Sequence, residues 1–106
     1  MPELFRGRKD SVLDQVAQAL AKYEEANPEA QTSYYRQNSI SVRIRVVDPA
    51  FSNLSKAERG RRVWPYLRKL PESVRGDITV LLLLAPDEMQ ESFGNLDFES
   101  PLPGKP

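Results

Sequence analysis

The 106-residue chain contains no histidine and no cysteine. The side chains most often used as general bases, thiolate nucleophiles and soft metal ligands are therefore missing. Carboxylates remain, and the candidates are Asp48, Glu58, Glu72, Asp77 and Asp87. No spacing pairs two of them for acid–base catalysis, and capping, loop and surface roles account for all five. With no Walker A or G-x-G-x-x-G motif either, we expect no enzyme activity, no metal and no cofactor.

Arginine is the residue type in this chain with the clearest capacity to bind a partner. Residues 36–75 hold 10 Lys or Arg and 3 Asp or Glu, whereas residues 77–106 hold 1 and 6. A basic strip of this kind can contact the phosphates or carboxylates of an anionic partner. The candidate residues are Arg43, Arg45, Arg59, Arg61 and Arg62. A solvated basic surface, neutralised in part by pairs such as Glu58 with Arg62, explains the same pattern equally well.

Apolar side chains suggest a second kind of contact. Segment 78–84 predicts a strand that needs cover on both faces, with Leu81 and Leu83 on the face opposite Val80 and Leu82. One layer of helices covers only one face. We therefore expect Leu81 and Leu83 to dock a protein partner or a second copy of the chain. Phe93 and Phe98, in the acidic C-terminal tail, are further candidates for apolar docking; the alternative is that this tail folds back over the sheet.

The elements that hold these residues follow from periodicity. Apolar residues at helical spacing predict a helix over residues 11–26, with Ser11 and Asp14 as a capping box. Alternation over residues 40–47 predicts a strand that buries Ile40 and places Arg43 and Arg45 on its other face. A short edge strand is expected over residues 32–36, before a turn.

A second helical region follows. Ser55 and Glu58 form an S-x-x-E capping box at its start. Pro65 lies inside the helical pattern, which predicts a kink or two short helices meeting there. Pro71 closes the region, and Gly76 marks the turn into the last strand.

The resulting order, α-β-β-α-β, predicts an α+β fold. We expect a two-layer sandwich in which a three-stranded mixed sheet carries helices on one face. The chain then divides into an N-terminal arm (1–10), an α+β domain (11–88) and an acidic, proline-containing, flexible tail (89–106).

This order, together with VRIRVVDPAF, LSKAERGRRVWPYL and ITVLLLLAPDE, resembles the BolA family, whose fold is related to the type II KH domain. The resemblance implies a BolA-like interaction or regulatory module. Members usually bind a 2Fe–2S cluster, shared with a monothiol glutaredoxin, through a histidine at the start of the last strand. Asp77 stands at that position here, and Gly60 stands where a second histidine is usual. A carboxylate is a poor substitute for imidazole at such a cluster, so the cluster-sharing role is not expected.

Nucleic-acid binding is the alternative function. The arginines would contact phosphates, while Tyr34 and Tyr35 would stack on bases. KH domains that bind RNA use a G-x-x-G loop, however, and the sequence contains none.

The cellular setting follows from what the sequence lacks. The N-terminal residues contain no apolar signal-peptide core, and the longest apolar run, residues 80–85, is too short to span a bilayer. We therefore expect a cytoplasmic protein that does not enter a membrane.

Overall fold

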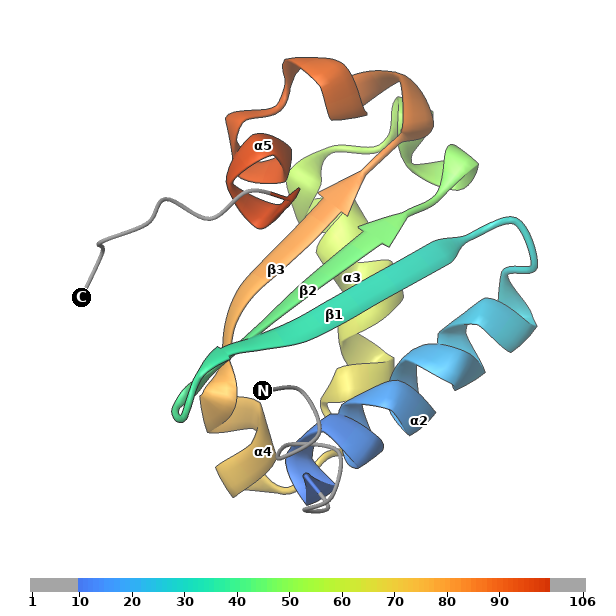
Figure 1. Cartoon of the computed structure of the whole chain (residues 1–106). Coiled ribbons are helices and arrows are strands. Elements are labelled where there is room, and N and C mark those ends of the chain that lie inside the picture. Colours follow the sequence, from blue (N-terminus) through green and yellow to red (C-terminus); the bar gives the residue numbers. More distant parts are fainter. Residues whose placement is uncertain (1–9, 100–106) are drawn as a thin grey trace.

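The computed structural model describes residues 10–99, except for the side chains of Glu91, Phe93 and Asp97 (Figure 1). Its helices and strands, in chain order, are α2 (Ser11–Ala26), β1 (Gln31–Asn38), β2 (Ser41–Val47), α3 (Lys56–Leu67), α4 (Glu72–Asp77), β3 (Ile78–Leu84) and α5 (Phe93–Glu99). Two 3-10 segments, η1 (Pro49–Asn53) and η2 (Pro86–Glu91), follow β2 and β3.

The three strands form one mixed sheet in the order β1-β2-β3, which confirms the predicted α+β class. β1 and β2 are antiparallel, with Tyr34 opposite Ile44. β2 and β3 are parallel, with Val46 opposite Leu83. The parallel pair needs a crossover connection, which η1, α3 and α4 supply. β2 is therefore the central strand, and within residues 10–99 no further strand pairs with the outer edge of β1 or of β3.

The core lies between one face of this sheet and the helices α2 and α3. Val42, Ile44 and Val46 from β2 are fully buried there. Val16, Leu20 and Tyr23 from α2, with Val63 and Leu67 from α3, cover them. Ile40 differs from its prediction: it sits in the turn between β1 and β2 and is 71% exposed. Ile40 forms part of this turn, so the alternation of buried residues in β2 begins at Val42 instead.

The helix ends show which side chains cap the helices. α2 begins at Ser11 as predicted, but its cap is Asp10, whose carboxylate accepts from the Leu13 amide at 3.2 Å. The Ser55–Glu58 capping box is confirmed, with both reciprocal hydrogen bonds present. Asn27 ends α2 through amide contacts to Tyr23 and Glu24, before Pro28 excludes helical backbone.

The region after the capping box differs from its prediction. α3 continues through Pro65 to Leu67 as one helix, so no break occurs at Trp64. Packing of Val63 and Leu67 against the sheet offsets the lost hydrogen bond. A separate helix, α4, follows Pro71 and includes Gly76, which was expected in a turn.

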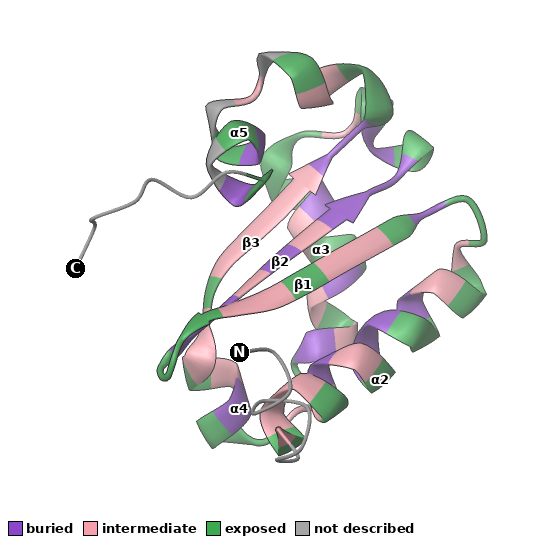
Figure 2. Cartoon of the chain, viewed as in Figure 1, coloured by how far each residue is buried: buried purple, intermediate pink, exposed green. Residues whose placement is uncertain are grey.

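The C-terminal segment also departs from expectation. Residues 86–99 form η2 and α5 rather than a flexible tail, and residues 100–106 lie outside the described part. α5 lies against the sheet face opposite α2 and α3 (Figure 1). Helices therefore lie on both faces, not one, and β2 carries most of the buried residues of the sheet (Figure 2).

Candidate functional site

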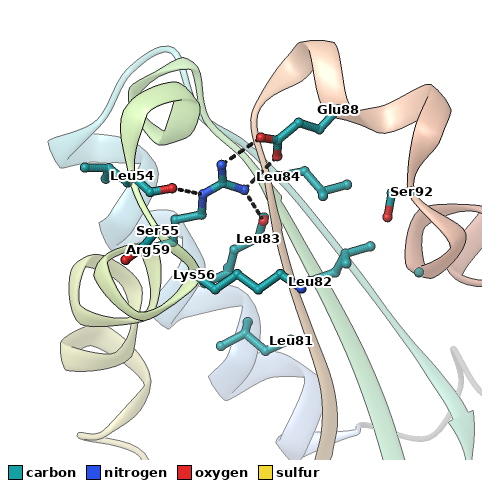
Figure 3. A pocket seen from close by; sticks show the side chains of 11 residues that line it. Leu54, Ser55, Lys56, Arg59, Leu81, Leu82, Leu83, Leu84, Glu88 and Ser92 are labelled. Atoms are coloured by element: carbon teal, nitrogen blue, oxygen red, sulfur yellow. Dashed lines mark hydrogen bonds and ion pairs between the residues drawn. The ribbon is translucent and has the colours of Figure 1, made fainter.

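A groove of about 790 Å³ lies along the outer edge of β3 (Figure 3). The start of α3 forms one wall, and η2 with the start of α5 forms the other. Its lining residues are Leu54, Ser55, Lys56, Arg59, Leu81, Leu82, Leu83, Leu84, Glu88, Ser92 and Gly94. The groove thus follows a strand and is mostly apolar, with charged groups confined to three side chains.

Two carbonyl hydrogen bonds show which backbone groups of β3 point toward β2 and which point toward the open edge. The Leu84 carbonyl accepts from the Asp48 amide on the β2 side at 3.0 Å. The Leu83 carbonyl points the other way and accepts from Arg59 Nη1 at 3.0 Å. Because successive peptide groups in a strand alternate, Leu81 and Leu83 direct their amides toward the open edge, whereas Leu82 bonds to β2. Among the described residues, no side chain bonds to those two outward amides.

Arg59 closes one end of the groove. Its guanidinium contacts the two Glu88 carboxylate oxygens at 2.6 and 2.7 Å, and its Nε donates to the Leu54 carbonyl at 3.1 Å. The side chain is 8% exposed and also lies over the Phe51 ring, 5.7 Å from its centroid. Arg59 is therefore buried and paired within the chain, and its role in binding an anionic partner stays a prediction.

Glu88 supplies the carboxylate that pairs with the buried Arg59 guanidinium. Besides Arg59, its Oε1 accepts from the Ala85 amide at 3.0 Å. The Arg59 guanidinium, aided by that amide, lowers the pKa of Glu88 to about 2. The carboxylate is thus ionised at neutral pH, and its pair with Arg59 carries no net charge into the groove.

Lys56 gives the groove its remaining charge. It is the first residue of α3 and is exposed. Its side chain extends across the groove toward Leu82 (Figure 3). Among residues 10–99 no salt bridge involves Lys56. With Arg59 and Glu88 neutralising one another, the groove has a net charge of +1.

The opposite face of the sheet holds the other arginine cluster. Arg45 Nη1 donates to Asn95 Oδ1 at 2.6 Å and to Glu99 Oε2 at 2.7 Å, and its guanidinium lies 4.9 Å from the Phe98 ring centroid. Arg43 bonds to Gln37 Oε1 at 3.0 Å and to the Tyr35 hydroxyl at 3.3 Å. The predicted solvent-facing arginines are thus engaged by the chain itself, and α5 provides most of the cover over Arg45.

The candidate apolar residues are divided between the two faces. Leu81 and Leu83 pack against the main core, so the prediction that they lack cover is wrong. Leu82 faces α5, where Gly94 permits close approach: a Cβ atom there would lie 3.0 Å from Leu82 Cδ1. Phe98 is 6% exposed and packs on the Tyr35 ring at 4.9 Å. The Phe93 side chain lies outside the described part.

Arg61 and Arg62 lie on α3, on the other side of the sheet from Arg43 and Arg45. Both are exposed, and Arg62 donates to Asn27 Oδ1 at 2.8 Å. Tyr34 is on the core side of β1 and Tyr35 on the α5 side, because adjacent strand residues face opposite ways. The five candidate arginines and two tyrosines therefore do not form one continuous surface.

Sequence reasoning missed the residues that shape the groove. Leu54 and Gly94 had no motif of their own, and they gather beside Lys56 only because the parallel β2–β3 pairing leaves β3 at the edge. The one signal in the sequence was the uncharged run 78–84, which is unusual for an edge strand.

Two classes of site are absent from the described residues. Between residues 10 and 99, no three His, Cys, Asp or Glu side chains gather as metal ligands would. No helix in that range combines the length and hydropathy needed to cross a bilayer. The sequence was also compared with protein-family models and with curated proteins, and no match was found in either comparison.

Proposed function

We propose that this chain is a non-catalytic protein-interaction module whose docking site is the groove beside β3. The observation that carries the proposal is the groove itself: an apolar channel of about 790 Å³ at an open strand edge, bounded by two separate segments. Concave, mostly apolar sites with few polar groups are typical binding sites. Arg59 and Glu88, the strongest candidates for chemistry there, neutralise one another.

A BolA-like, KH-related identity forms part of the same proposal. A mixed three-stranded sheet with α2 and α3 on one face supports it. The residues do not fit a shared iron–sulfur cluster: the carboxylate of Asp77, at the position of the usual histidine, lies 3.7 Å from Arg36 Nη1. An oxygen donor already facing a cation is a poor ligand for such a cluster. We therefore propose no cofactor.

Capture experiments with charge-reversed variants test the docking site. The tagged full chain would be used to capture partners from the native host, with and without nuclease, alongside K56E and K22E variants. Lys56 lines the groove, whereas Lys22 is an exposed lysine on α2. We expect specific capture that survives nuclease, weakens in K56E and persists in K22E.

The other outcomes would contradict the proposal. Capture that nuclease abolishes would identify a nucleic-acid tether, the alternative function. Capture that is equal in wild type and K56E but lost in K22E would place the partner on the helical face instead.

A further inference from the structure

We propose that the groove takes an extended peptide segment carrying an acidic residue, which adds to the sheet as a fourth strand beside β3. This inference rests on the proposed interaction role and names the class of partner. Addition of a strand to an open sheet edge is an established mode of peptide recognition, in which main-chain hydrogen bonds supply affinity and side-chain pockets supply specificity.

The first support is the row of backbone groups at the edge. Leu81 offers both its amide and its carbonyl outward, and Leu83 offers its amide, while the Leu83 carbonyl is already bonded to Arg59. An incoming strand would satisfy three groups in sequence. A partner that docked only side chains would leave these groups unpaired where it excluded water, which costs free energy.

The second support is the shape of the groove. The strand edge lies between Leu54 and Lys56 on one wall and Ser92 on the other (Figure 3). Gly94 also lines the groove. Such a channel admits one extended chain. A second copy of this protein would have to bring its own α3 and α5 walls into the same space, so edge-to-edge pairing of two copies is disfavoured.

The third support is charge. Lys56 gives the groove its net positive charge, which selects a carboxylate on the incoming segment. The chain's own ends are poor occupants. Residues 1–9 carry three basic residues and one acidic residue, and residues 100–106 contain three prolines, which lack the amides that a strand requires.

Selection from a random ten-residue peptide library displayed on phage tests the inference against the full chain. Selected peptides would be synthesised and titrated by fluorescence anisotropy against wild type, K56E and K22E. We expect acidic, prolineless binders, a weakening of about threefold or more in K56E, and no change in K22E. N-methylation along a binder should abolish binding at alternate positions, because only every second amide of an added strand faces β3.

Amide hydrogen exchange supplies the decisive readout. Saturating peptide should slow exchange at the Leu81 and Leu83 amides by about tenfold or more, with a smaller change at Leu82, which already bonds to β2. Peptide binding without protection at Leu81 and Leu83 would overturn strand addition. So would a dimer by light scattering that protects both amides without peptide.

The two proposals can fail separately. A library that yields no binder, together with nuclease-resistant capture lost in K56E, would overturn strand addition but keep the groove as the site for a folded partner. If wild type and K56E bind equally well in both experiments, the proposed docking site is overturned as well.

Discussion

At the scale of single residues, the Glu88 carboxylate joins three parts of the chain. It binds Arg59 of α3 and the Ala85 amide at the start of η2, and Arg59 in turn binds β3. Hydrogen bonds to a charged group of this kind are stronger than neutral ones. Their contribution depends on Glu88 remaining ionised.

This dependence predicts a loss of stability in acid. The pKa of Glu88 is about 2 in the folded chain, against an ordinary value of 4.5. Its contribution is therefore present above pH 4.5 and is lost as the pH falls from there through 2. The Glu88 side chain is 35% exposed, so solvent screening limits the contribution to about 1 kcal/mol.

Urea unfolding at pH 7, 4 and 3 would measure this effect. We expect the E88Q variant to be less stable than wild type at pH 7 and to approach it at pH 3. The E25Q variant, which changes an exposed carboxylate on α2, should parallel wild type at every pH. An E88Q variant that loses stability with acid as steeply as wild type would contradict the assignment.

Tyr23 is a second residue whose role in stability the sequence did not predict. It is 1% exposed, and its hydroxyl donates to Asp48 Oδ2 at 2.5 Å. Burial, followed by the nearby Asp48 carboxylate, raises the pKa of this phenol above its ordinary range. Asp48 itself is 3% exposed and also accepts from the Ala50 amide at 2.9 Å. The bond therefore ties the end of α2 to the end of β2.

We predict that Y23F lowers the free energy of unfolding by about 1–3 kcal/mol, because Asp48 would lose one of its buried hydrogen bonds. The Y34F variant removes a hydroxyl from a tyrosine that is 37% exposed and should change stability by less than about 0.5 kcal/mol. Chemical denaturation of the two variants would give the comparison. Equal effects would show that the Tyr23–Asp48 bond contributes little.

At the scale of elements, α5 is the piece whose removal has the most distinctive consequence. It covers Arg45, Leu82 and Tyr35 through Asn95, Gly94 and Phe98. Deletion of residues 90–106 should expose this apolar face and increase both dye binding and self-association. Deletion of residues 100–106 alone should change neither. Unchanged dye fluorescence and a monomeric mass for the longer deletion would rule out the covering role of α5.

The sequence predicted those elements in which one local signal dominates. The bounds of α2, the alternation of β2 from Val42 onward and the Ser55–Glu58 cap all appear as expected. β1 is longer than its expected core, since pairing with β2 rather than side-chain pattern sets its length. Two short helices meeting at Pro65 were not found, because α3 runs through this residue as one helix, while the kink stays a prediction.

The candidate site was harder to predict, for a physical reason. Segment 78–84 is apolar at almost every position, so its pattern could not show which face meets the core. Arg59 and Arg45 were recognised as capable of binding anions, but their anions, Glu88 and Glu99, lie 29 and 54 residues away in the sequence. Only the fold brings these charges together.

At the scale of the whole molecule, the uneven charge along the chain is partly cancelled in space. Salt bridges join Arg45 to Glu99 and Arg59 to Glu88, so the acidic C-terminal segment neutralises part of the basic body. These two pairs weaken the long-range attraction that the basic strip exerts on polyanions.

The layered structure predicts an order of local stability. β2 lies between two strands and carries three fully buried side chains, whereas α5 has seven residues and packs against one face. Native-state hydrogen exchange should therefore be slowest in β2 and at least about a hundredfold faster in α5. Amides of α5 that exchange as slowly as those of β2 would show that the molecule opens only as one unit.

The bond from Arg59 to the Leu83 carbonyl also bears on how the protein remains dispersed. Strand β3 has no charged residue and no proline, which is a composition that nucleates fibrils when its edge is bare. Arg59 occupies that carbonyl, and Glu88 holds the guanidinium in place. The row of unpaired backbone groups along the edge of β3 is therefore shorter at one end. We therefore expect Arg59 to disfavour edge-to-edge association of β3 while leaving the rest of the strand edge accessible.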